Sequence, residues 1–152
     1  MEHPVRYVRK VRFSDTDTQG HVFNANYFVY FDDAITDYLE ALGLPYREIT
    51  RRGHDLVLAR AECDFRSSGA FGETLLTGVR VARLGNTSVT FALRVEEEKT
   101  GRVVAEGVEV YVVLEHASRR PTPVPDYLRE AVARLEKAAP GSVAIRVGSR
   151  KD

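Results

Sequence analysis

The fold is decided by residues 13–27, which read FSDTDTQGHVFNANY. This polar stretch, with Gly20 inside it, separates two segments of different hydrophobic period. Before it, residues 5–13 alternate with the period of two that is typical of a strand. After it, the apolar residues of about 24–42 recur at helical spacing, and Gly43 is placed to end that helix. The stretch is therefore a loop that leads from a strand into a long helix.

The rest of the chain is dominated by strand patterns. Four segments rich in Val, Leu and Phe are expected to be strands, at about 55–66, 74–84, 87–97 and 103–114. Residues 125–137 have the pattern of a second amphipathic helix. The order predicts an α+β fold, in which an antiparallel sheet wraps one long central helix. Such a sheet leaves an edge uncovered, so we expect a homodimer or homotetramer.

Two turns between the predicted strands have recognisable signals. Gly85-Asn86 suits a two-residue hairpin turn with positive φ. Residues 98–101, which end in Gly101, suit a slightly longer hairpin loop. Both signals favour hairpin-linked neighbouring strands.

Length and composition indicate one globular domain. The chain has 152 residues, of which 43% are hydrophobic and 29% charged. We expect the domain to cover residues 1–138, and residues 139–152 to form a tail that is either frayed or a short strand. The 22 basic and 22 acidic residues cancel, which argues against nucleic acid or an anionic membrane as a partner.

The expected compartment is the cytoplasm. No continuous apolar stretch marks a signal peptide or a membrane span. The single cysteine, Cys63, cannot form an intramolecular disulfide, and no metal-type spacing surrounds it. We therefore expect neither a metal nor a cofactor.

Three interpretations of residues 15–26 compete. Asp15, Asp17 and Gly20 occupy positions one, three and six of an EF-hand loop. Position twelve is Asn26 instead of a bidentate Glu, which argues against calcium. The two aspartates can instead be turn and cap residues. They can also serve catalysis, because the free amides of a helix amino end stabilise an oxyanion beside a reacting carboxylate. Spacing alone leaves the last two interpretations open.

Residues 13–27 resemble the signature of the 4-hydroxybenzoyl-CoA thioesterase family. In that family Asp, any residue, Asp, two residues, Gly, a short apolar step and Asn-Tyr open the central helix. Residues 65–73 and the break at 84–88 resemble the second half of the same family, so the resemblance covers about residues 5–135. It implies the hotdog fold and the hydrolysis of an acyl-CoA thioester. A noncatalytic acyl-CoA binding or sensing module is the alternative.

The resemblance also implies roles for single residues. Asp17 falls on the catalytic carboxylate, and the backbone amide of Asn24 on the oxyanion donor. Asp32 falls on a position that contacts the phenol of the hydroxybenzoyl substrate, the alternative being an ordinary exposed helix acid. His21 is either a general base or a hydrogen-bonded structural histidine. The other expected substrate-binding residues are Asn26, Tyr27 and Ser67.

The coenzyme site departs from the family pattern. The hydroxybenzoyl enzyme carries basic residues before the serine of its fourth strand, whereas residues 85–87 precede Ser88 here and include none. Arginine suits bidentate phosphate recognition, so Arg83, Arg119 and Arg120 are expected to replace that contact, with a hydroxyl from Ser88. Solvated surface charge is the alternative for each arginine. Acyl carrier protein is the alternative to coenzyme A.

Overall fold

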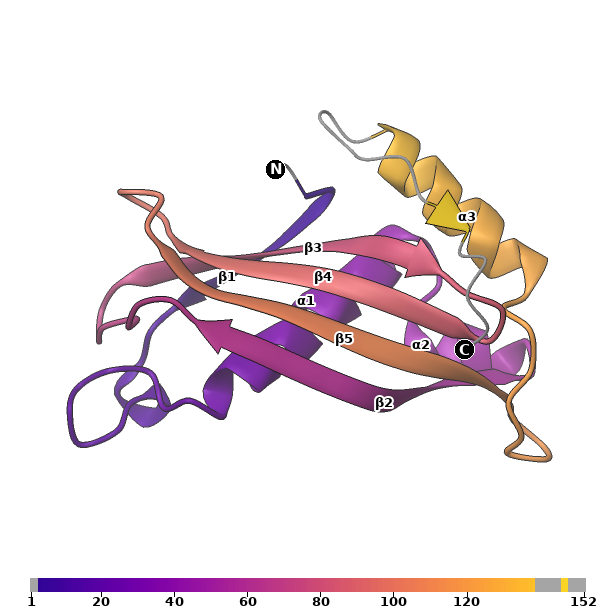
Figure 1. The fold of residues 1–152 in the computed structure, drawn as a ribbon, viewed down its shortest axis with the longest axis horizontal. Helices are drawn as coiled ribbons and strands as arrows, with labels where there is room; N and C mark the ends of the chain where they lie inside the picture. Colours follow the sequence, from indigo (N-terminus) through magenta and orange to yellow (C-terminus); the bar gives the residue numbers. More distant parts are fainter. Residues whose placement is uncertain (1–2, 139–145, 148–152) are drawn as a thin grey trace.

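The computed structural model describes residues 3–138 and 146–147, and they form one antiparallel sheet that wraps a long helix (Figure 1). The helices are α1 (Asn26–Ala41), α2 (Tyr46–Arg51) and α3 (Asp126–Ala138). The strands are β1 (Val5–Lys10), β2 (His54–Phe65), β3 (Thr74–Leu84), β4 (Ser88–Glu97), β5 (Val103–Glu115) and β6 (Arg146–Val147). The antiparallel order is β1-β3-β4-β5-β2, and β6 pairs in parallel with the end of β3.

Most predicted elements are confirmed, and the differences are local. The first strand ends at Lys10 instead of Phe13, because a short 3-10 helix (Phe13–Asp15) follows it. The six-residue helix α2 was not predicted, since so short a segment shows no period. The predicted positive φ at Gly85-Asn86 is wrong: neither residue is among the described residues with a positive φ. The division into a domain of residues 1–138 and a tail stays a prediction, and most of that tail lies outside the described residues.

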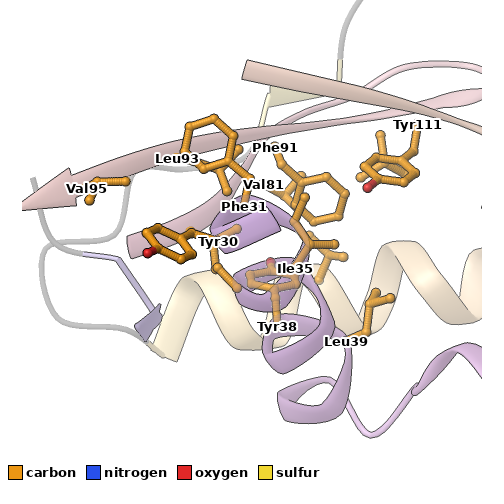
Figure 2. Close-up of a cluster of buried hydrophobic side chains, with 14 of the residues drawn as sticks. Tyr30, Phe31, Ile35, Tyr38, Leu39, Val81, Phe91, Leu93, Val95 and Tyr111 are labelled. Atoms are coloured by element: carbon orange, nitrogen blue, oxygen red, sulfur yellow. The ribbon is translucent and has the colours of Figure 1, made fainter. Parts of the chain in front are cut away.

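One face of α1 forms the centre of the core. Figure 2 shows aromatic and aliphatic side chains of α1 pointing at the strands, among them Tyr30, Phe31 and Ile35. Buried residues recur along α1 with the period of a helix, as the sequence predicted. The helix ends at Ala41. Two residues later Gly43, with a φ of 75°, donates a hydrogen bond from its amide to the Glu40 carbonyl and reverses the chain.

The helix and the sheet approach most closely at Gly107 of β5. A Cβ atom there would overlap Cε2 of Phe31, and it would lie 2.6 Å from Cζ of the same ring. Phe31 itself is completely buried. The absence of a side chain at Gly107 therefore lets Phe31 lie directly on the sheet, and this contact sets the height of α1 above β5.

The two sides of the sheet differ in what covers them. Strand β2 pairs only with β5, and its outer edge has no partner among the described strands. Its apolar side chains are not covered: Val57, Leu58 and Phe65 are 38%, 47% and 50% exposed. At the other side α3 packs beside β3, where the hydroxyl of Tyr38 donates to the buried Glu136 at 2.8 Å. Among the described strands β2 and β1 are thus the two edges of the sheet, and β2 is the longer of them.

Replacing Gly107 by Ala is expected to lower the free energy of unfolding by about 2 kcal/mol, because the new methyl group forces the Phe31 ring off the sheet. Urea unfolding of the variant and of the wild type measures this change. The same substitution made together with Phe31→Leu should cost clearly less, since the smaller side chain can move aside. An equal cost in both backgrounds would contradict the assigned contact.

Candidate active site

The loop between β1 and α1 is anchored by Asp15. The guanidinium of Arg9 binds its carboxylate with two hydrogen bonds, Nη2 to Oδ1 at 2.7 Å and Nε to Oδ2 at 3.0 Å. The amide of Arg12 donates to Oδ2 at 2.9 Å. Burial alone would raise the pKa of Asp15, but the hydrogen bonds from Arg9 and Arg12 outweigh it and hold that pKa below its usual value. Asp15 is therefore a structural carboxylate.

The backbone of Asp15 fixes the start of α1. Its carbonyl accepts a hydrogen bond from Nδ2 of Asn26 at 2.8 Å and another from the amide of Phe23 at 2.9 Å. The predicted substrate-binding residue Asn26 thus has its side-chain nitrogen engaged within the loop. The helix cannot swing away from the strand without breaking both bonds.

Residues 67–71 close the other side of the loop. The amide of Val22 donates to the carbonyl of Gly69 at 2.8 Å, and the amide of Gly69 donates to the hydroxyl of Tyr27 at 3.1 Å. A Cβ at Gly69 would lie 2.8 Å from Cδ1 of Leu75, so a larger residue there would have to displace that methyl group. Tyr27 is 2% exposed, and the hydroxyl of Ser67 donates to the Val103 carbonyl at 2.8 Å. Both predicted substrate-binding side chains therefore have structural partners.

Asp17 lies at the exposed tip of the loop. Its Oδ1 accepts a hydrogen bond from the amide of Gln19 at 2.9 Å, which is a local turn contact. Gly20, with a φ of 74°, then turns the chain so that the carbonyl of His21 meets the Asp17 amide at 2.9 Å. Among the residues described, none forms an ion pair with this carboxylate. Asp17 is thus held in place by its backbone while its carboxylate stays open to a ligand.

Unpaired amides lie at the amino end of α1. The helix begins at Asn26, and the preceding Asn24 and Ala25 are both exposed. Within residues 3–138 and 146–147 the amides of these two residues donate no hydrogen bond. The first turn contains no acidic side chain that would satisfy them. The amino end of a sixteen-residue helix is therefore open to a negatively charged oxygen, in the same loop as Asp17.

The arrangement of sheet, helix and loop has known counterparts. A family model described as the thioesterase-like superfamily matches residues 11–132. The chain belongs to this superfamily. The hotdog fold implied by the sequence is thereby confirmed, whereas membership of the narrower 4-hydroxybenzoyl-CoA thioesterase family stays a prediction.

Individual members of the superfamily are similar to this chain over most of their own length. A putative esterase of Aquifex aeolicus is 30% identical over 125 residues, which are 73% of this chain and 98% of the relative. A 1,4-dihydroxy-2-naphthoyl-CoA hydrolase of Nostoc punctiforme is 27% identical over 139 residues, 90% of this chain and 91% of the relative. The crystal structure of a Thermus thermophilus thioesterase with coenzyme A and Zn is 32% identical, with a TM-score of 0.78. The match covers 90% of this chain and 97% of that one.

A polar cluster on the inner side of the sheet of this thioesterase-like chain was not predicted from the sequence. Glu109 of β5 is 3% exposed, and the hydroxyl of Tyr111 donates to its Oε2 at 3.4 Å. Burial raises the pKa of Glu109 to about 7. Burial, and then the nearby carboxylate of Asp32, raises the pKa of Tyr46 to about 12. The carboxylate of the predicted residue Asp32 is exposed, and its charge contributes to the raised pKa values of Glu109, Tyr46 and Tyr111.

A signal for Glu109 was present in the sequence. It falls on the inward side of a strand whose alternate residues, Gly107, Tyr111 and Val113, are all buried. A charged residue at such a position is rare unless it has a role or a partner. Asp32 has its own pKa raised by burial and by the neighbouring Asp33.

The predicted coenzyme-binding residues lie at the opposite end of the sheet from Asp17. Arg119 forms an ion pair with Asp55, near the start of β2, at 2.6 Å. Phe65, at the other end of β2, packs its ring 5.7 Å from that of Tyr27. The ten residue steps between Asp55 and Phe65 span roughly 33 Å. One subunit therefore does not bring Arg119 to Asp17.

The other predicted coenzyme-binding residues also lie away from Asp17, whereas His21 lies in the same loop as Asp17. Arg83 lies at the end of β3 away from the loop, and Ser88, at the start of β4, is 3% exposed. Arg120 is exposed next to Arg119. His21 is half-buried, and its backbone bridges to Ala70.

Across the described residues, no group of three or more His, Cys, Asp or Glu side chains is arranged to hold a metal ion. None of the helices described is long and apolar enough to cross a membrane.

The two aspartates of the loop should respond differently to substitution. Asp15→Asn is expected to lower the free energy of unfolding by about 2 kcal/mol, because it removes the charged partner of Arg9. Asp17→Asn should change it by less than about 0.5 kcal/mol, since Asp17 makes only a local turn contact. Urea unfolding of both variants at pH 7 measures the difference.

The pH dependence supplies the control. The pKa of Asp15 is lowered in the folded chain, so its stabilising effect is complete above the unfolded carboxyl pKa of about 3.9 and is lost as the pH falls further. The gap between wild type and Asp15→Asn should therefore narrow below about pH 4. A gap of constant size down to pH 3 would contradict the assignment.

Proposed function

We propose that the protein hydrolyses an acyl-CoA thioester to the free acid and coenzyme A, with Asp17 as the catalytic carboxylate. The observation that carries this proposal is the exposed carboxylate of Asp17 in the same short loop as the unpaired amides at the start of α1. Hydrolysis of a thioester needs such a pair, one group to act at the carbonyl carbon and one to stabilise its oxygen.

The chemistry can follow two routes. Asp17 either attacks the carbonyl carbon, forming an anhydride that water then opens, or takes a proton from an attacking water. In both routes the carbonyl oxygen becomes negative, and the amide of Asn24 donates a hydrogen bond to it. The carbon–sulfur bond then breaks, and coenzyme A leaves as the thiolate and takes up a proton. Only the anhydride route can place isotope-labelled oxygen from water in Asp17.

We further propose that the acyl group is a hydroxylated aromatic acid. Asp32 is eight residues beyond Asn24 on the helix, a rise of roughly 12 Å, and side chains lean back toward the amino end of a helix. A carbonyl held at Asn24 would thus place the far side of a one- or two-ring acyl group near Asp32 and Glu109. The naphthoyl-CoA hydrolase activity named for the Nostoc punctiforme relative supports this choice.

Coenzyme A is the proposed carrier, supported by the coenzyme in the Thermus thermophilus thioesterase structure. Arg83, Ser88, Arg119 and Arg120 remain the candidates for its phosphates. We propose a homodimer or homotetramer, because the exposed apolar side chains of β2 need a cover. We also propose the cytoplasm as its compartment, where a single cysteine stays reduced.

Asp17→Asn is expected to reduce turnover by about a hundredfold or more, because the variant cannot attack or accept a proton. Release of free thiol from a panel of acyl-CoA esters measures turnover. Asp37→Asn, which removes an exposed carboxylate on α1, is the control and should keep full activity. A wild type that binds coenzyme A yet cleaves no ester would favour the binding module instead.

Glu109→Gln should reveal the acyl specificity. Above pH 7 the wild-type carboxylate is ionised and can accept a charge-assisted hydrogen bond from a substrate hydroxyl, which the neutral amide cannot replace. At pH 8 we expect kcat/KM for 1,4-dihydroxy-2-naphthoyl-CoA to fall about tenfold, with a change below about twofold at pH 6, where Glu109 is protonated.

Two comparisons keep this test specific. The unsubstituted 1-naphthoyl-CoA lacks the hydroxyl, so its kcat/KM should be nearly the same in wild type and Glu109→Gln at both pH values. Glu106→Gln changes the neighbouring glutamate that faces the outer side of the sheet, and it should alter neither substrate. Equal losses for both substrates would mean that Glu109 only supports the fold.

A further inference from the structure

We infer that the outer face of the sheet binds a small phosphorylated polyol, such as a sugar phosphate, in a pocket where Arg80 and Arg94 donate to the phosphate. The pocket has a volume of about 250 Å³. It lies on the side of β3 and β4 that alternates with the buried core side, so it faces away from α1. None of the described residues of the Asp17 loop lines it, so it is a site apart from the proposed hydrolysis.

The strand pairing places the two arginines side by side. Arg80 of β3 pairs with Ala92 of β4, and two positions along β4 Arg94 pairs with Gly78 of β3. All four positions lie on the outer face of the sheet, because side chains alternate between faces along a strand. The small residues Ala92 and Gly78 leave the space above the sheet to the two guanidinium groups.

His3 closes one side of the pocket. A Cβ atom at Gly78 would lie 2.5 Å from Nδ1 of His3, so the missing side chain lets the imidazole rest directly on β3. Burial, and then the charges of Arg80 and Arg6, lower the pKa of His3 to about 4. The imidazole is therefore neutral at pH 7, where the positive charge of the pocket comes from arginines alone.

Both arginines contain a buried N–H group without an acceptor. Within residues 3–138 and 146–147, neither Nε of Arg80 nor Nε of Arg94 donates a hydrogen bond. Glu96 lies 2.8 Å from Nε of Arg94 and forms an ion pair with it, but the atoms are not aligned for a hydrogen bond. Glu136 of α3 interacts with Arg80 at longer range only, and its Oε2 is engaged by Tyr38. Unsatisfied buried donors are unfavourable, so this end of the pocket favours a ligand with several acceptor oxygens.

The charge at this end fits a phosphate. Arg6 of β1 lies next to the pocket, in a small adjoining cavity that His3, Arg94 and Glu96 also line. The three guanidinium groups of Arg6, Arg80 and Arg94 thus share one nearby surface carboxylate, that of Glu96. Two positive charges are left over. A phosphate monoester carries up to two negative charges at pH 7, and arginine binds its oxygens in pairs.

The opposite end of the pocket offers acceptors. Glu62 and Asp64 of β2 line it, two strand spacings or roughly 10 Å from β4. Each has an arginine of its own, Arg60 at 2.7 Å and Arg66 at 3.5 Å. A paired carboxylate still has free lone pairs, which suit the hydroxyl groups of a ligand. A ligand with a phosphate at one end and hydroxyls at the other matches both ends.

The first experiment measures binding by calorimetry, with glucose 6-phosphate and glycerol 3-phosphate as probes. At least one of them is expected to bind with a Kd of about 1 mM or lower. Inorganic phosphate and glucose should each bind at least about tenfold more weakly, since each makes only part of the contacts. If neither probe binds, the site is overturned. If inorganic phosphate binds as tightly as the better probe, the polyol is overturned as its ligand.

The second experiment removes the donor that has no partner. Arg80→Met should weaken the Kd for the better probe at least about tenfold, because it deletes the guanidinium and keeps an apolar stem. Arg80→Lys should recover only part of the affinity, since an ammonium group cannot donate two parallel hydrogen bonds. Arg47→Met, at an exposed position of α2, is the matched control and should bind as the wild type does. Equal affinities of Arg80→Met and the wild type would contradict the assignment.

Urea unfolding separates a lost contact from a lost fold. Without ligand, the midpoint of Arg80→Met should lie within about 0.3 M of the wild type, because the deleted group has no partner to lose. Addition of the probe should raise the midpoint of the wild type and leave that of Arg80→Met unchanged. A rise of the same size in both proteins would show that the probe binds elsewhere.

The third experiment separates this pocket from the candidate active site. Asp17→Asn and the double variant Arg119→Ala/Arg120→Ala should bind the probe with the Kd of the wild type, since none of these residues lines the pocket. A Kd weakened about tenfold or more in either variant would place the phosphate at the coenzyme or catalytic residues and overturn the proposal. The outcome does not depend on whether the protein cleaves any thioester.

Discussion

The ion pair between Arg9 and Asp15 is the contact on which the candidate site depends. It joins the end of β1 to the loop that follows, and the carbonyl of the same aspartate holds the first residues of α1. The exposed tip with Asp17 and the unpaired amides beside Asn24 are both positioned by this one anchor. Because the carboxylate of Asp15 is buried and accepts two hydrogen bonds from Arg9, it gives this short polar loop the rigidity that a reacting group requires.

The rest of the molecule gives this loop a fixed frame. Phe31 lies on Gly107, so α1 cannot move relative to β5, and Tyr27 reaches across to the amide of Gly69. Helix α3 packs beside β3, whereas the outer edge of β2 has no partner among the described strands.

The sequence predicted the fold well because long helices and strands carry periodic patterns. It failed where a single tertiary contact decides the conformation: the carbonyls of Gly85 and Asn86 are held by Arg129, more than forty residues away, so their turn is not the expected one. For the site, spacing could not separate Asp15 from Asp17, since the partner that distinguishes them is Arg9 on the preceding strand. Glu109 was not predicted, although it falls on the inward side of β5 among buried alternate residues.

The separation of the two aspartates also bears on how such a family diversifies. Asp15 makes the contacts that stabilise the folded loop. Asp17, two positions later, makes no comparable contact. A lineage can therefore exchange Asp17, the proposed catalytic carboxylate, for another side chain while the scaffold persists unchanged. Evolution of new chemistry on this fold then begins from a position where most replacements are tolerated, and selection acts on the reaction alone.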